Sequence, residues 1–143
     1  MAYLYDTLKE NFGKIAISKI EIPNYISDNL KPSYGERAYQ KEAFQRVILF
    51  YNEDFEGKPR NPFHLMYNMA TGSGKTLIMA GLMLYLYEKG YRNFLFFVHS
   101  NTILDKTREN FLNASANKYL FNQDIVVNGQ KVYIKEVRNF DEA

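Results

Sequence analysis

The fold is decided by residues 63–98, which read FHLMYNMATGSGKTLIMAGLMLYLYEKGYRNFLFFV. The two ends of this stretch, residues 63–69 and 93–98, are short and almost continuously apolar, as expected of strands in a parallel sheet covered on both faces. Residues 76–89 are rich in Leu and Met, lack Pro and precede Gly90, a residue type that commonly ends helices. Strand, glycine-rich turn, helix and strand predict a right-handed βαβ unit in an α/β protein.

The turn at residues 70–76 reads Ala-Thr-Gly-Ser-Gly-Lys-Thr and lies between the first predicted strand and the helix. Its glycines let the backbone curl so that successive N–H groups and the helix N-terminus face one hollow, which suits a polyphosphate. Lys75 can reach the β- and γ-phosphates as a point charge, and the Thr76 hydroxyl can ligate Mg²⁺. We therefore predict a phosphate site with Lys75 and Thr76 as its catalytic residues, Thr76 as metal ligand, and a nucleotide-binding set of Thr71, Gly72, Ser73, Gly74, Lys75 and Thr76.

A second candidate segment, Arg37-Ala38-Tyr39-Gln40, begins a predicted helix that runs from residues 35–36 to Tyr51. A glutamine amide can pair with the donor-and-acceptor edge of adenine, whereas guanine presents two acceptors there, so Gln40 favours ATP over GTP. Tyr39 or Arg37 could stack on the base. Without the phosphate loop, Tyr39 and Gln40 would be interpreted as ordinary helix residues.

Three segments in the same order, Arg37-x-Tyr39-Gln40, residues 69–76 and residues 97–102, resemble the start of a superfamily 2 helicase motor. Within that superfamily the closest resemblance is to the Res subunit of type III restriction endonucleases and its DEAD/DEAH-like relatives. In them Met or Ala commonly begins the phosphate loop, as Met69 does here, where the general pattern has Gly. The resemblance covers residues 34–112 and implies a P-loop NTPase, RecA-like fold with a parallel sheet flanked by helices, incomplete in this chain.

The resemblance also implies roles for individual residues. Gln40 would read adenine, the loop and Lys75 would hold the phosphates, and Ser100, Asn101 and Thr102 would contact the nucleic-acid backbone. Many superfamily members have Pro and Arg near the positions of His99 and Asn101, so any contact here would use backbone N–H groups and hydroxyls. The alternative for these three residues is a helix N-cap, because Ser or Asn before an apolar helix is what capping requires.

Composition sets further limits on function. The 143 residues include no Cys, 46% apolar residues and a net charge of +2, with basic and acidic residues interleaved. A disulfide scaffold and a thiol nucleophile are excluded, and no basic block indicates nucleic acid. The longest apolar stretch falls short of the roughly 20 residues of a membrane span, and the N-terminus has no signal pattern, so we expect a cytoplasmic protein.

The rest of the chain divides into an N-terminal extension, residues 1–33, and a partial RecA-like ATP-binding domain, residues 34–143. Residues 4–12 are predicted to be helical, and the apolar pattern of residues 102–112 predicts an amphipathic helix. Residues 125–127 and 131–134 flank Asn128-Gly129, which predicts a C-terminal hairpin with a type I′ turn. Asp141-Glu142 does not follow the buried apolar strand that a magnesium-binding Asp-Glu motif should follow. We therefore expect a fragment of a longer protein that alone does not hydrolyse ATP.

The leading hypothesis is the ATP-binding part of a DNA-dependent ATPase or translocase, from a type III restriction enzyme or related helicase, with cleavage performed elsewhere. ATP and Mg²⁺ are its expected cofactors, and DNA and a modification (methyltransferase) subunit its expected partners, with no membrane involved. A small-molecule or nucleotide kinase shares the phosphate loop, and a nucleotide-sensing adaptor would keep the loop without catalysis. Gln40 and the segment at Ser100 argue against the kinase.

Overall fold

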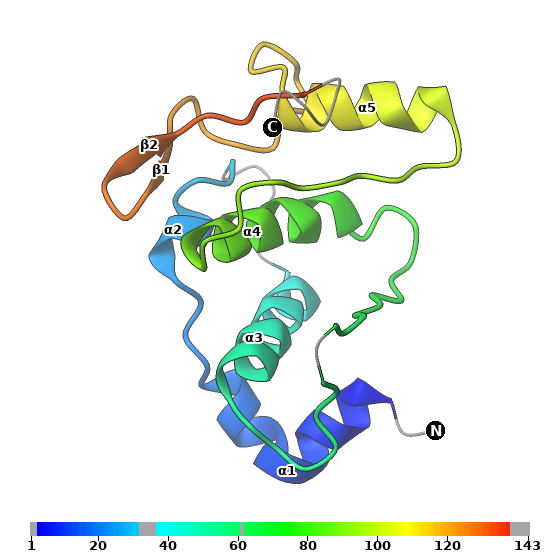
Figure 1. The fold of residues 1–143 in the computed structure, drawn as a ribbon, viewed down its shortest axis with the longest axis vertical. Helices are drawn as coiled ribbons and strands as arrows, with labels where there is room; N and C mark the ends of the chain where they lie inside the picture. Colours follow the sequence, from blue (N-terminus) through cyan, green and yellow to red (C-terminus); the bar gives the residue numbers. More distant parts are fainter. Residues whose placement is uncertain (1–2, 32–36, 61, 138–143) are drawn as a thin grey trace. The chain divides into compact units, whose positions relative to one another are not determined.

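The computed structural model describes residues 3–31, 37–60 and 62–137. The chain forms two compact units, one made of residues 1–23 and 36–78 and the other of residues 24–35 and 79–143. The elements follow in the order α1 (Leu4–Ser18), α2 (Asn24–Ser27), α3 (Ala38–Asn52), α4 (Lys75–Glu88), α5 (Asn101–Phe111), β1 (Ile125–Val127) and β2 (Gln130–Val132) (Figure 1).

The first unit is built on the packing of α1 against α3 (Figure 1). Leu8 and Ile17 of α1 and Leu49 of α3 form its buried apolar cluster. Gln45 is 4% exposed, and its amide donates hydrogen bonds of 2.9 and 3.0 Å to the carbonyls of Ser18 and Ile20. These bonds fix the end of α1 against the middle of α3, the helix that begins with the Arg37–Gln40 segment.

Four predicted helices are confirmed: the amphipathic helix predicted at residues 102–112 is α5, and the other three differ from it in how well their ends agree. The predicted helix up to Tyr51 is α3, although residues 35–36 lie outside the described residues. The predicted helix 76–89 is α4, and Gly90 after it has φ +100°, the left-handed conformation expected of a helix stop. The predicted helix 4–12 is the part of α1 before Gly13, whose non-helical φ of +76° and ψ of 156° kink α1 there, and a second helical segment follows up to Ser18.

The parallel sheet predicted from residues 63–69 and 93–98 is absent from the described part of the chain, where the sheet consists of β1 and β2 alone. Burial nevertheless alternates along residues 63–70, half-buried and exposed in turn, which is the period of a strand. Met66 is 91% and Phe97 90% exposed, so coverage of these runs on both faces stays a prediction. An apolar run indicates only that a segment prefers to be buried as a strand. A sheet forms when a neighbouring segment exchanges backbone hydrogen bonds with it.

The second unit contains α2, α5 and the hairpin of β1 and β2. The antiparallel register pairs Ile125 with Val132, and Asn128 and Gly129 have φ +50° and +77°, as a type I′ turn requires. The predicted hairpin is therefore confirmed, with its second strand at residues 130–132 instead of 131–134. Phe121 is fully buried between the rings of Phe111 and Tyr119, which lie 5.8 and 5.7 Å away between ring centroids.

A buried asparagine joins α2 to the hairpin in the second unit. Asn29 is 3% exposed, its amide donates to the carbonyls of Tyr25 and Val126, and its Oδ1 accepts from the Val126 N–H at 2.7 Å. The side chain thus bonds both backbone groups of one strand residue, as a neighbouring strand would. No pattern in the sequence indicated this contact.

Candidate nucleotide site

The loop at residues 70–76 has the curled backbone that its glycines predict. Gly72 has φ +77° and Gly74 φ +87°, and the N–H and hydroxyl of Ser73 both donate to the Ala70 carbonyl, at 3.2 and 2.6 Å. Helix α4 begins directly afterwards at Lys75. In any α-helix, the N–H groups of the first turn lack a carbonyl one turn earlier in the helix to accept their hydrogen bonds. The loop therefore ends at a helix N-terminus, the arrangement that binds anions.

The Lys75 ammonium folds back onto the loop itself. Its Nζ donates hydrogen bonds of 2.6 and 2.9 Å to the carbonyls of Met69 and Ala70, and the side chain is exposed. Phosphate oxygens are stronger acceptors for a cation than neutral carbonyls, so this ammonium can exchange its partners for a bound phosphate. Thr76 follows Lys75 as the second residue of α4, and its side chain is partly buried.

The geometry also explains why Met69 is tolerated where the general pattern has glycine. Met69 does not have a positive φ, so its backbone conformation suits an ordinary side chain. Its contribution to the loop is the carbonyl that accepts from Lys75. Sequence reasoning missed the carbonyls of Met69 and Ala70, because backbone acceptors leave no mark on residue type.

The Arg37–Gln40 segment is bonded to the phosphate loop within the first unit. Gln40 is 4% exposed, its Oε1 accepts from the Arg37 N–H at 3.1 Å, and its Nε2 donates to the Ser73 carbonyl at 2.9 Å. The Tyr39 hydroxyl donates to the same carbonyl at 3.0 Å and accepts from Arg37 Nη1 at 2.9 Å. The structure therefore brings together the segments predicted for the base and for the phosphates.

Gly74 is required on two independent grounds. Its φ of +87° is strained for a residue with a side chain, and a Cβ built at this position would collide with Nε2 of Gln40. Gly72, with φ +77°, has no neighbouring atom in the way of a Cβ. The contact of the Gln40 amide with the loop therefore depends on Gly74 in particular.

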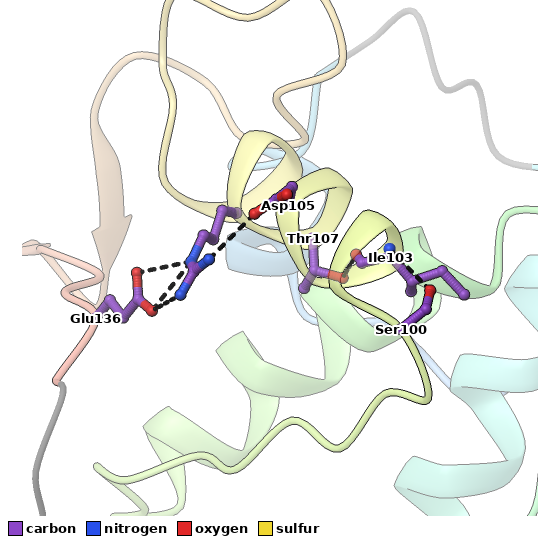
Figure 2. Close-up of polar contacts among 6 residues, drawn as sticks. Ser100, Ile103, Asp105, Thr107 and Glu136 are labelled. Carbon is purple, nitrogen blue, oxygen red and sulfur yellow. Dashed lines mark hydrogen bonds and ion pairs between the residues drawn. The ribbon is translucent and has the colours of Figure 1, made fainter.

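The Ser100–Thr102 segment belongs to the second unit, and its geometry confirms the N-cap interpretation. Ser100 has an extended backbone, and its Oγ accepts from the Ile103 N–H at 3.4 Å, as Figure 2 shows. Asn101 and Thr102 are exposed as the first residues of α5. Contact of this segment with nucleic acid stays a prediction.

Replacement of Ser100 by alanine is expected to lower the free energy of unfolding by about 0.5–1 kcal/mol, because the first turn of α5 loses its side-chain acceptor. Chemical denaturation followed by circular dichroism measures this. Thr107, whose hydroxyl donates to the Ile103 carbonyl at 2.8 Å inside the same helix, offers a matched control. A Thr107→Ala variant that lost more stability than Ser100→Ala would contradict the capping role.

Beyond its cap, α5 is tied by charge to the segment after β2. Arg108 donates to Glu136 at 2.7 Å and to Asp105 at 3.1 Å, and its hydrogen bonds to these carboxylates raise the pKa of its guanidinium (Figure 2). The side chains of Arg108 and Glu136 are 44% and 43% exposed and that of Asp105 is 70% exposed, so the net stabilisation is small. The guanidinium of Arg108 is therefore an exposed cation on α5 that is already paired with two carboxylates.

Tyr67, two residues before Met69, is half-buried and carries a buried hydroxyl that sequence reasoning missed. Its hydroxyl finds no hydrogen-bond partner in the described structure, and burial raises the pKa of the phenol.

Within residues 3–31, 37–60 and 62–137, no cluster of three acidic, His or Cys side chains could hold a metal. The Asp141-Glu142 pair lies outside the described residues. Across the described helices, none combines the length and apolar character needed to cross a membrane.

Comparison with known proteins identifies the family. The model of the family described as "Type III restriction enzyme, res subunit" matches residues 33–140, which include all three candidate segments. The probable type III restriction-modification enzyme HindVIP Res subunit of Haemophilus influenzae is 42% identical over 123 residues, 83% of this chain and 24% of that relative. The chain thus spans about a quarter of the length of this curated relative. No solved structure matches the present chain. This protein therefore belongs to the family of type III restriction enzyme Res subunits, and its membership implies a P-loop NTPase fold.

Proposed function

We propose that this chain is the ATP-binding part of a DNA-dependent ATPase or translocase that acts in type III restriction. The observation that supports it most is the Ser73 carbonyl, which joins the adenine segment to the phosphate loop. In the proposed site, the loop N–H groups and Lys75 hold the β- and γ-phosphates, and Thr76 contributes a hydroxyl to Mg²⁺. A Mg²⁺ held there by the Thr76 hydroxyl would supply positive charge beside the β- and γ-phosphates.

Gln40 is proposed to recognise adenine without losing its contact with the loop. An amide has two N–H donors and a carbonyl oxygen with two lone pairs, and the contacts to Ser73 and Arg37 use one of each. One donor and one acceptor position therefore remain, which is the pair that the N6/N7 edge of adenine requires. Arg37 and Tyr39 lie beside Gln40 and complete the proposed base-binding set.

In the proposed RecA-like domain, residues 34–143, the segments 63–69 and 93–98 are strands of a parallel sheet, and residues 1–33 form an extension. The alternating burial along residues 63–70 supports this, as do the exposed side chains of Met66 and Phe97. Strands of such a sheet are covered by helices on both faces, which would remove these apolar side chains from water.

DNA and a modification subunit are the proposed partners, with cleavage carried out elsewhere in the complex. Ser100, Asn101 and Thr102 are proposed to contact the DNA backbone, because a helix N-terminus with exposed polar side chains suits a phosphate. DNA as substrate favours a cytoplasmic location. The Haemophilus relative is named as a restriction-modification enzyme subunit, in agreement with such a complex.

Two measurements test the proposal. Calorimetric titration of the chain with Mg–ATP and Mg–GTP should show tighter binding of ATP, because Gln40 matches the adenine edge. ATP hydrolysis by the complete protein with its modification subunit should rise when DNA is added. Equal affinity for both nucleotides would contradict the role of Gln40, and phosphoryl transfer to a small acceptor without stimulation by DNA would favour the kinase alternative.

A further inference from the structure

The contact between Tyr39 and the phosphate loop has a role beyond base binding. We propose that Tyr39 is a positioning residue: its hydroxyl, together with the Gln40 amide, holds the Ser73 carbonyl so that the Gly74 N–H is presented to a bound phosphate. The inference rests on the nucleotide-binding function proposed above. It assigns the tyrosine to the phosphates of the nucleotide, whereas its position beside Gln40 suggested stacking on the base.

The geometry of one peptide unit carries the argument. The Ser73 carbonyl accepts from Tyr39 Oη at 3.0 Å and from Gln40 Nε2 at 2.9 Å. A carbonyl oxygen has two lone pairs, so both of its acceptor positions are used. In a trans peptide, the carbonyl of one residue and the N–H of the next point in opposite directions. Two donors from α3 that hold the Ser73 carbonyl therefore direct the Gly74 N–H away from α3.

This peptide needs an external support because of its neighbours. Gly72 and Gly74 flank Ser73, both have positive φ, and glycine changes between backbone conformations at low cost. Rotation of the Ser73–Gly74 peptide would exchange the N–H for a carbonyl oxygen, which repels phosphate. Within the loop, the N–H and hydroxyl of Ser73 donate hydrogen bonds to the Ala70 carbonyl. These bonds do not involve the Ser73 carbonyl and so do not restrain it.

A charged donor strengthens the support. Arg37 Nη1 donates to the Tyr39 hydroxyl at 2.9 Å, and that hydroxyl donates to Ser73. Hydrogen bonds in such a chain polarise one another, so the guanidinium makes the phenol a stronger donor. A bound phosphate would draw Lys75 away from the carbonyls of Met69 and Ala70. The hydrogen bonds from Arg37 to Tyr39 and from Tyr39 to Ser73 would still hold the loop from the side of α3.

Binding of a ligand without a base separates positioning from stacking. The probe is magnesium tripolyphosphate, compared with Mg–ATP by calorimetric titration of the unaltered chain and of Tyr39→Phe, which keeps the ring and removes the hydroxyl. Tyr133→Phe, an 82% exposed tyrosine, is the matched control. We expect Tyr39→Phe to weaken both ligands by the same factor, about three- to tenfold, as for one hydrogen bond, and Tyr133→Phe to change neither.

Amide chemical shifts provide a second measurement that needs no ligand. In ¹⁵N-labelled chain, Tyr39→Phe should shift the Gly74 amide resonance and leave that of Gly90, a glycine beyond the end of α4, in place. An unshifted Gly74 resonance, or loss of ATP affinity with tripolyphosphate affinity intact, would overturn the positioning role. If the unaltered chain bound neither ligand, the proposed function would fall and take this inference with it. If it bound both and Tyr39→Phe bound both equally well, only the inference would fall.

Discussion

Replacing Lys75 with alanine is expected to weaken the binding of Mg–ATP by about 10- to 150-fold, the range for loss of hydrogen bonds to a charged partner. The ammonium lies on the carbonyls of Met69 and Ala70, within the loop that would surround the phosphates. Without it, the loop N–H groups and the helix N-terminus still attract an anion, so affinity falls but does not vanish. Calorimetric titration of both forms with Mg–ATP measures the change.

The control for this variant is Lys9→Ala, which removes the same charge from an exposed position on α1 in the same unit. Its affinity for Mg–ATP should equal that of the unaltered chain, because screening by salt weakens interactions between distant surface charges. Lys75→Arg keeps the charge with a larger, planar head group and should recover only part of the affinity. Equal loss in the Lys9 and Lys75 variants would show that net charge, and not the loop, determines binding.

Replacing Asn29 with alanine is expected to lower the free energy of unfolding by about 2–4 kcal/mol, more than loss of one ordinary hydrogen bond. The buried amide bonds the N–H and carbonyl of Val126 and the carbonyl of Tyr25, all within 2.7 Å. Alanine leaves these backbone groups without their partner, and a buried polar group without a hydrogen bond is costly. Urea denaturation followed by circular dichroism gives the change.

Two variants make the Asn29 result specific. Asn113→Ala removes an exposed amide whose Oδ1 accepts from the Ser115 N–H, and should cost under about 1 kcal/mol because water replaces the lost bond. Asn29→Asp keeps the acceptor for the Val126 N–H but loses both donors, so it should destabilise the chain nearly as much as alanine. A stability loss at Asn29 no larger than that at Asn113 would refute the structural role of this amide.

The elements that the sequence predicted correctly depend on neighbours along the chain. Helix α4 and its stop at Gly90 follow from a Leu- and Met-rich run that ends in a residue able to adopt φ +100°. The hairpin follows from Asn128-Gly129, since the two residues of a type I′ turn both need positive φ. The cap at Ser100 acts within one helical turn. Such signals need no knowledge of the rest of the fold.

Features that depend on distant partners are the ones that the sequence did not specify. The amide of Asn29 bonds a residue 97 positions away, and nothing in the local composition indicates its partner. The apolar runs at residues 63–69 and 93–98 suggested paired strands, but ladder hydrogen bonds require a neighbour in space that the runs do not specify. The sequence suggested a base as partner for Tyr39, which stays a prediction, and did not indicate the hydrogen bond of its hydroxyl to the loop.

By itself, the sequence determined that residues 70–76 form a curled loop before a helix, because two glycines and the run after them permit little else. It also determined the residue types available to a nucleotide, among them the Lys75 ammonium, the Thr76 hydroxyl and the Gln40 amide. Only the tertiary structure decided that Gln40 and Tyr39 meet at the Ser73 carbonyl, 33 and 34 residues further along the chain. The physical reason is that Gln40 Nε2 lies where a Cβ at position 74 would stand, and Gly74, which has no side chain, leaves the room for this contact.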